Sequence, residues 1–467
     1  MASTASGIAL AQLITIFMLA LITVMPNIEI HGLSFKLIPI TSLFPKNLTL
    51  EEKHYKLVKI STTRADFHVQ PKQHDYSALI TSTNSTMIKS TNTITPSLSI
   101  RRRVPSGFYL TQVSIGSKPF SPYLVMDPGT DLTWVQCQGC TNCFPVRGTG
   151  NFKFQESQSY RKLPCNHPLC VPKICTADRL YCRYSNRYLT SSGNGFLSTE
   201  TFTFPYSTTN QTTKYSSLVF GCGIDNRNAP FNAPDNVIAG VFGLGLTQHS
   251  ILHQLQNQTK RRFSYCLTTS DWPTLLHFGD NASMKPRQSG IQTTPLVSNS
   301  PTLRYYVSML GISIDNKRLV IDPNVFKLKP MYKGGFVVDS GSPYSFLVEG
   351  AYNILREEMI QYIAAHYTGL RPVRRGLGKF DLCYNLTTTR PGGYSFPSLT
   401  YHLNRANYFM KPDVVFQDFG TVRCLAMMVN KDDGPTILGA FQQTNYRFLF
   451  DASESTMSLS FAPEICV

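Results

Sequence analysis

The sequence predicts a mostly β protein made of two related lobes with a few short helices. From Phe108 onward, short runs of β-branched and aromatic residues alternate with Gly, Pro, Asn and Ser, as strands alternate with turns. One motif recurs 212 residues further along the chain. The chain has 467 residues, of which 42% are apolar and 15% charged, so it can bury two substantial cores.

The first 28 residues are predicted to direct the chain into the secretory route. They contain a largely apolar run from Ile8 to Met25, which is typical of a signal peptide. A run of this length can also just span a bilayer, so a signal anchor is the alternative. No later stretch is long enough to be a membrane helix, and we expect no membrane insertion after removal of a signal.

Residues 29–104 are interpreted as a pro-segment followed by its linker. They begin with the amphipathic stretch GLSFKLIPITSLFP and a short predicted helix, TLEEKHYKLVKI. The Ser/Thr/Asn-rich stretch ALITSTNSTMIKSTNTITPS then has the composition of a flexible linker. The basic run at 101–103 is a candidate processing site at its end.

The N-terminal lobe is expected at 105–298 and the C-terminal lobe at 299–467. Strands are predicted in FYLTQVSIG and LVFGCG of the first lobe, and in YYVSMLGISI and FVVDSGS of the second. Helical periodicity is scarce. The best candidate helix lies at 350–367, and a shorter one at 250–256.

The cysteines and glycosylation motifs also indicate secretion. Twelve cysteines behind a signal sequence predict a disulfide framework, with the pairing left open: Cys137, Cys140, Cys143, Cys165, Cys170, Cys175, Cys182, Cys222, Cys266, Cys383, Cys424 and Cys466. The C-x2-C-x2-C spacing of CQGCTNC could hold a metal or an iron–sulfur cluster instead, but the fourth ligand is missing. Glycosylation motifs occur at Asn47, Asn84, Asn210, Asn257, Asn281 and Asn385.

The candidate catalytic residues lie in an internal repeat. LVMDPGTDLTWV at 124–135 matches FVVDSGSPYSFL at 336–347, which places Asp127 and Asp339 at equivalent positions. Each copy is followed by two apolar residues and a Gly, in GVFGLG at 240–245 and in TILGAF at 436–441. One Asp-x-Gly-Ser/Thr motif alone would be an ordinary turn, but two such sets indicate two copies of one structural unit.

Two such units related by a pseudo-twofold axis would bring the aspartates together. The carboxylates could not both ionise cheaply, so one pKa would rise, the other would fall, and the pair would share a proton. A water between them could then attack a peptide carbonyl without a metal, a cofactor or a covalent intermediate. Gly129 and Gly341 would allow the tight turns, and the hydroxyls of Thr130 and Ser342 would orient the carboxylates.

The chain resembles the pepsin-like aspartic proteases of the plant nepenthesin-like subgroup. The resemblance covers nearly the whole chain and rests on the cysteine-rich insert between Cys137 and Cys182 and on the motifs DLTWVQC, GFLSTETFTF, GVFGLG, FSYCL, YYVSMLGISI, FVVDSGS, FDLCY and ILGAFQQTNYRFLFD. It implies a bilobal all-β fold with a cleft between the lobes, Asp127 and Asp339 as the catalytic pair, and a flap that carries Tyr188 over the cleft.

The sequence departs from this family pattern in two places. Members of the family usually have Thr where Pro128 stands, and its hydroxyl and N–H bond across to the opposite turn. Pro128 offers neither group, whereas Ser340 keeps both on the other side. Leu189 replaces the Gly that usually follows the flap tyrosine.

The sequence therefore predicts a secreted aspartic endopeptidase that acts on polypeptides at acid pH. We expect a zymogen, activated by removal of residues up to about 104, and a monomer located in the apoplast or cell wall, or in the vacuole. The alternative is a catalytically weak or inactive pepsin-like protein that binds another protein or inhibits a glycosidase. The net charge of +16 is interpreted as a solvated basic surface, since no nucleic-acid-binding motif is present.

Overall fold

The structure of the chain is a computed structural model. Its described residues are 34–39, 47–69, 109–171, 174–187, 192–205, 212–229, 232–268, 274–285, 288–297, 304–330, 333–373, 378–386 and 393–466. The predicted signal segment, the linker and the basic run at 101–103 lie outside them.

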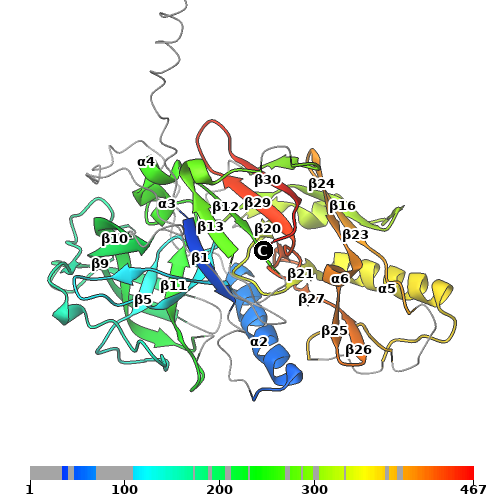
Figure 1. The fold of residues 1–467 in the computed structure, drawn as a ribbon, viewed down its shortest axis with the longest axis horizontal. Coiled ribbons are helices and arrows are strands. Elements are labelled where there is room, and N and C mark those ends of the chain that lie inside the picture. The colour runs from blue at the N-terminus through cyan, green and yellow to red at the C-terminus, as the bar shows by residue number, and fades with distance from the viewer. Residues whose placement is uncertain are drawn as a thin grey trace, which may run out of the picture. The chain divides into compact units, whose positions relative to one another are not determined.

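The fold is all-β and bilobal, as predicted (Figure 1). The strands of the first lobe are β2 (Tyr109–Gln112), β3 (Ser114–Ile115), β4 (Tyr123–Asp127), β5 (Trp134–Gln136), β6 (Arg161–Lys162), β7 (Ile174–Cys175), β8 (Cys182–Arg187), β9 (Ser192–Pro205), β10 (Thr212–Arg227), β11 (Ile238–Gly243), β12 (Arg262–Cys266), β13 (Thr274–Phe278) and β14 (Gln292–Pro295). Most of their buried apolar positions hold Val, Ile, Leu, Phe or Tyr, which suit pleated, half-buried surfaces.

Most strands of the second lobe form smaller sheets. Its strands are β15 (Tyr306–Val307), β16 (Met309–Ile314), β17 (Lys317–Arg318), β18 (Leu328–Lys329), β19 (Lys333–Gly334), β20 (Phe336–Val338), β21 (Ser345–Val348), β22 (Cys383–Asn385), β23 (Leu399–Leu403), β24 (Ala406–Met410), β25 (Phe416–Phe419), β26 (Val422–Leu425), β27 (Met427–Asn430), β28 (Thr436–Leu438), β29 (Tyr446–Asp451) and β30 (Ser458–Pro463). A five-stranded sheet, ordered β15-β20-β28-β21-β27, carries the second aspartate turn.

The largest sheet joins the two lobes. β29 and β30 come from the end of the chain, yet β29 pairs antiparallel with β12 of the first lobe (Figure 1). Phe263 on β12 stacks on Phe450 of β29 with ring centroids 4.6 Å apart, and both side chains are buried. Burial of such large apolar rings holds the lobes together.

The described parts of the segment predicted as a pro-segment, 34–39 and 47–69, pack into the fold. β1 (Ser34–Pro39) lies between β13 and β2 and pairs antiparallel with both. α2 (Leu50–Val69) begins with reciprocal hydrogen bonds between Thr49 and Glu52, which form a capping box.

The prediction that the first helix is short was wrong, since α2 continues to Val69. The Ser and Thr residues after Ile60 are weak helix formers and suggested an end there. Leu57, Val58, Ile60 and Ser61 are buried against the rest of the protein, so packing stabilises this part of the helix. The hydroxyl of Thr62 also donates to the carbonyl oxygen of Val58.

The other helices are few. α5 (Glu349–His366) matches the helix predicted at 350–367, and α3 (Ile251–Gln254) and α4 (Gln256–Thr259) occupy the region predicted at 250–256. Ser250 caps α3 by accepting from the N–H of Leu252. The remaining helix of the described residues is α6 (Pro412–Val415), and short 3-10 turns η2 (Phe154–Glu156), η3 (Gly279–Asn281) and η4 (Pro323–Phe326) also occur. Within the described residues, no helix is both long and apolar enough to cross a membrane.

All twelve cysteines form disulfides, as the sequence predicted. The pairs are Cys137–Cys222, Cys140–Cys143, Cys165–Cys175, Cys170–Cys182, Cys266–Cys466 and Cys383–Cys424. Of the asparagines in glycosylation motifs, Asn47, Asn257 and Asn385 are exposed and Asn281 is half-buried, while Asn84 and Asn210 lie outside the described residues.

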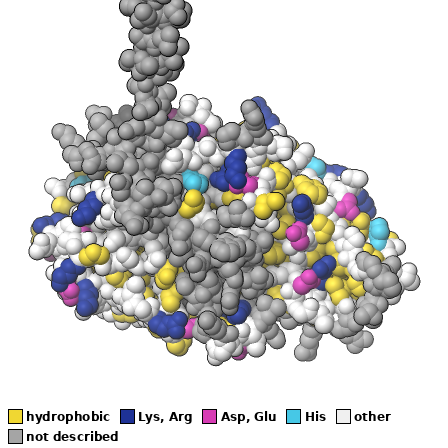
Figure 2. Space-filling view, in the orientation of Figure 1, with side chains coloured by type: hydrophobic (Ala, Val, Ile, Leu, Met, Phe, Trp, Pro, Cys, Tyr) yellow, Lys and Arg dark blue, Asp and Glu magenta, His cyan; other side chains and the backbone are white. Residues whose placement is uncertain are grey.

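The described surface carries charges of both signs. On the face shown in Figure 2, Lys and Arg side chains are scattered, and several lie beside Asp or Glu. Ion pairs of this kind include Lys118 with Glu156 and Lys317 with Glu358. Such interspersed charges belong to an ordinary solvated surface.

The first testable prediction concerns stability in acid. Burial and the positive charge of Arg447 lower the pKa of His277 on β13 to about 4, although Glu464 acts in the opposite direction. The folded protein therefore keeps this imidazole neutral where the unfolded chain would protonate it, and stability is lost as the pH falls from about 6.5 towards about 4. His277→Gln should reduce this loss.

The measurement is the urea midpoint of unfolding at pH 7 and at pH 4.5. His366→Gln, at the exposed end of α5, serves as the control and should keep the natural pH dependence. An unchanged dependence in His277→Gln would contradict the prediction.

Candidate active site

Each aspartate turn follows a buried strand and is held by the same arrangement of three strands. β4 ends at Asp127 and pairs parallel with β11, where Asp127 lies opposite Gly243; β11 also pairs antiparallel with β5. In the second lobe β20 leads to Asp339 and pairs parallel with β28, which pairs antiparallel with β21. The repeat in the sequence is therefore a repeat in structure.

The glycines that follow two apolar residues lie where strands pass closest to the aspartate turns. A Cβ atom at Gly243 would lie 2.2 Å from the carbonyl oxygen of Asp131, and one at Gly439 would lie 2.3 Å from the carbonyl carbon of Tyr344. Neither position has room for a side chain, so glycine is required by the close approach of backbone.

The two carboxylates are oriented by matching hydrogen bonds. Asp127 Oδ1 accepts from the N–H of Gly129 at 2.8 Å, and its Oδ2 accepts from the hydroxyl of Thr130 at 2.6 Å. Asp339 Oδ1 accepts from the N–H of Gly341 and its Oδ2 from the hydroxyl of Ser342, both at 2.9 Å. The side chains that the sequence assigned to orientation thus contact the carboxylates directly.

The two turns meet, so that both carboxylates surround one point. A Cβ atom at Gly341 would lie 2.7 Å from Asp127 Oδ1 and 2.9 Å from Asp339 Oδ1. Asp127 is 3% exposed and Asp339 is fully buried. Gly341 is therefore needed for the approach of the two acids as well as for its own turn.

The Pro128 side of the contact between the turns lacks the usual donors. Pro128 is buried and has no N–H to donate. On the opposite turn, the buried hydroxyl of Ser340 has no hydrogen-bond partner among the described residues. The bonds to Asp127 nevertheless come from Gly129 and Thr130, so none of them depends on residue 128.

The hairpin predicted to form the flap is described up to Arg187 and again from Ser192. Its strands β8 and β9 pair through Arg187 opposite Ser192, so a hairpin connects them. Tyr188 and Leu189 lie in the connection, outside the described residues. The placement of a tyrosine over the cleft stays a prediction.

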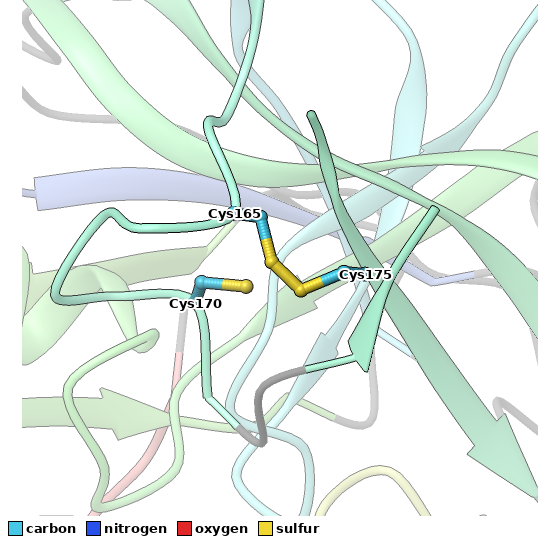
Figure 3. Close-up of side chains that lie close together, drawn as sticks. All are labelled: Cys165, Cys170 and Cys175. Carbon is cyan, nitrogen blue, oxygen red and sulfur yellow. A yellow bond between two sulfur atoms is a disulfide. The ribbon is translucent and has the colours of Figure 1, made fainter. Parts of the chain in front are cut away.

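A cluster of three cysteines lies in the insert that follows the first aspartate turn. The sulfur atoms of Cys165, Cys170 and Cys175 lie within 4.8 Å of one another, and Figure 3 shows the bond between Cys165 and Cys175 with the sulfur of Cys170 beside it. Cys170 is bonded to Cys182. Because a metal ligand must be a thiolate, disulfide-bonded sulfurs of this kind do not provide a metal site.

Sequence reasoning missed the residues that surround the two turns. Tyr305 and Gln443 are buried next to them, and Ser61 of α2 accepts a hydrogen bond from the N–H of Tyr344 at 3.2 Å. Tyr305 and Gln443 lie in motifs that were recognised only as family markers. Their hydrogen bonds join residues far apart in the sequence, which no local pattern reveals.

Two buried aspartates at the junction of two related β lobes define a protein with the architecture of the pepsin-like enzymes. Comparison with known proteins agrees: a family model described as "Xylanase inhibitor N-terminal" matches residues 109–280, and one described as "Xylanase inhibitor C-terminal" matches residues 304–462. The chain belongs to the pepsin-like aspartic protease family, in its plant nepenthesin-like subgroup.

Individual relatives support the assignment. The chain is 33% identical to aspartic proteinase nepenthesin-1 of Nepenthes gracilis, over 76% of this chain and 78% of the relative. It is 31% identical to aspartic proteinase nepenthesin-2 of the same plant, over 77% and 78%. Among solved structures, the chain is similar to edgp, with a TM-score of 0.63 and 17% identity. The match covers 79% of this chain and 94% of the edgp chain, which supports the fold.

The second prediction tests the packing around the aspartate turns. Gly439→Ala should destabilise the protein by about 1–3 kcal/mol or more, because its methyl group would overlap the backbone of Tyr344. Gly350→Ala in α5 is the control, since a Cβ there meets only Asp432 Oδ1 at 3.7 Å. This control should stabilise slightly, by roughly 0.5–1 kcal/mol. Thermal unfolding of both variants gives the comparison, and equal melting temperatures would refute the prediction.

Proposed function

We propose that this protein is an aspartic endopeptidase that hydrolyses peptide bonds of polypeptides at acid pH, with Asp127 and Asp339 as its catalytic pair. The observation that carries the proposal is the convergence of both carboxylates on one point, each oriented by one N–H and one hydroxyl. Relatives at 33% and 31% identity are named aspartic proteinases.

The geometry suits catalysis by a shared proton. A water at the point between the carboxylates would lose a proton to the ionised acid as it attacks the scissile carbonyl carbon. The protonated acid would donate a hydrogen bond to the carbonyl oxygen as negative charge develops there. Because the cycle needs one protonated and one ionised carboxylate, activity is expected in acid.

Pro128 lowers efficiency in this proposal but does not abolish it. The proline removes an N–H and a hydroxyl from the contact between the turns, and Ser340 has no partner for its hydroxyl among the described residues. Loss of such bonds costs on the order of 1–3 kcal/mol when a polar group stays buried and unpaired. The donors to Asp127 itself are intact.

The protein is further proposed to be a secreted zymogen whose pro-segment is residues 29–104. α2 contacts both lobes: Lys56 Nζ lies 2.6 Å from Asp235 Oδ2 in the first lobe, and Ser61 bonds to Tyr344 in the second. Tyr344 follows Ser342 by two residues, so α2 lies next to the second aspartate turn. The disulfides and exposed glycosylation motifs support passage through the secretory route to the apoplast or cell wall, or to the vacuole.

A second candidate function is binding or inhibition of another protein, such as a glycosidase. The two matching family models are described as xylanase inhibitor domains, and Pro128 and Leu189 depart from the protease pattern. A binding protein would need the fold but not the shared proton.

The third prediction separates these two functions. The mature chain should digest an unfolded protein at about pH 4, pepstatin should stop the digestion, and Asp339→Asn should abolish it. Pro128→Thr should digest faster, by up to roughly 10²-fold if the proline misplaces Asp127. Digestion by the Pro128→Thr variant but not by the natural chain would mean that the proline inactivates the site. That result would favour the binding function.

The fourth prediction concerns activation. Lys56→Glu replaces the ion pair with Asp235 by a repulsion, so the pro-segment should dissociate and be removed faster when the full chain is placed in acid. Lys53→Glu makes the same change of charge on the same helix and is the control. The time course of conversion to the mature chain can be followed by gel electrophoresis. Equal rates for Lys56→Glu and Lys53→Glu would mean that the ion pair of Lys56 with Asp235 does not hold the pro-segment in place.

A further inference from the structure

The two aspartate turns keep matching geometry although Pro128 cannot make the bonds that would cross between them. Asp127 and Asp339 have equivalent donors at similar distances. The opposite hydroxyl, on Ser340, is buried without a hydrogen-bond partner among the described residues. Some other contact between the lobes must therefore fix the position of one aspartate turn relative to the other.

Tyr305 makes such a contact. Its carbonyl oxygen accepts from the N–H of Val338 at 3.2 Å, directly before Asp339. Its hydroxyl donates to the carbonyl oxygen of Leu244 at 2.7 Å, and the N–H of Leu244 donates to the carbonyl oxygen of Asp127 at 3.0 Å. One residue of the second lobe thus connects the backbones of both aspartate turns.

Packing fixes the side chain of Tyr305 between these two ends. The residue is 1% exposed, and its ring packs edge-on against Phe450 with centroids 4.8 Å apart and against Phe263 at 5.7 Å. A buried, rigid ring of this kind can transmit a position between the lobes, because it has few alternative rotamers in a close-packed interior.

Tyr265 makes a second connection, from the first lobe to the aspartate turn of the second lobe. It lies on β12 of the first lobe, and its hydroxyl donates to Gln443 Oε1 at 2.6 Å. Gln443 Nε2 donates to the carbonyl oxygen of Leu438 at 2.8 Å, and that oxygen also accepts from the N–H of Asp339 at 3.1 Å. Both side chains are fully buried.

Tyr265 lies near Ser340, the residue whose hydroxyl faces the turn of Pro128 without a hydrogen-bond partner among the described residues. Burial raises the pKa of its hydroxyl, the nearby hydroxyl of Ser340 lowers it, and the charge of Asp339 raises it further. The Ser340 hydroxyl is therefore a neighbour of Tyr265, although the two do not meet the geometry of a hydrogen bond.

We propose that Tyr305 and Tyr265 are positioning residues that hold the two aspartate turns in register across the lobes, in place of the bonds that Pro128 cannot make. Neither tyrosine is assigned a contact with substrate. The hydroxyl of Tyr305 acts through Leu244 on the backbone of Asp127, and the hydroxyl of Tyr265 acts through Gln443 and Leu438 on the backbone of Asp339. The kinetic part of this inference rests on the proposed protease function.

The test is a double-mutant cycle between Tyr305→Phe and Pro128→Thr. Tyr305→Phe keeps the ring and removes only the hydroxyl, so the chain should fold. In the natural chain we expect kcat to fall by about 10- to 100-fold with little change in KM, since the carboxylates move relative to each other. In the Pro128→Thr chain the restored bonds should limit the loss to less than about threefold.

Tyr265→Phe provides a second cycle with the same expectation. Tyr446→Phe is the matched control, because it removes an equally short bond, from a hydroxyl to the carbonyl oxygen of Phe409 at 2.7 Å. Tyr446→Phe should leave kcat unchanged in both backgrounds. Equal losses of kcat on Tyr305→Phe with and without Pro128→Thr would overturn the proposal.

Melting temperatures of the same variants keep this inference separate from the proposed function. If Tyr305 connects the turns, its hydroxyl should contribute more to the melting temperature of the natural chain than to that of the Pro128→Thr chain, whether or not either chain cleaves protein. Coupled melting temperatures without cleavage in any variant would support the connection and reject the protease. Additive melting temperatures together with additive kinetics would reject the connection.

Discussion

The structure depends on the burial of two carboxylates around a single point. Two acids can be held this close only if each has fixed donors, and each has one N–H and one hydroxyl from its own turn. The point between them leaves no room for a side chain on Gly341, and the strands that pass the turns require glycine at 243 and 439. The two related lobes supply these turns twice and bring them together.

Pro128 shows which parts of this arrangement are local. The orientation of Asp127 is set within its own turn, so a proline that donates nothing leaves the orientation intact. The distance between the turns is a different matter, because it depends on contacts between the lobes. The shared sheet, with Phe263 stacked on Phe450, and the buried tyrosines at 265 and 305 set that distance.

The sequence predicted the features that repeat locally. The aspartates, the glycines and the hydroxyl residues beside them form a pattern that occurs twice, and in the structure Gly129, Thr130, Gly341 and Ser342 donate to the two carboxylates. The extent of α2 and the connections through Tyr305 and Gln443 could not be predicted, because they depend on partners far along the chain, such as Leu244 and Leu438. The disulfide pairs were open for the same reason, since many pairings satisfy one set of spacings.

The cost of the buried acids is itself an argument about function. Removing a carboxylate from water is unfavourable, and two that face each other add repulsion unless a proton is shared. A scaffold used only for binding would be more stable with neutral side chains at 127 and 339. Proteins depart from the most stable local choice mainly at functional sites. Glycines with no room for a Cβ and hydroxyls aimed at both acids serve the same two groups, which favours catalysis over binding alone.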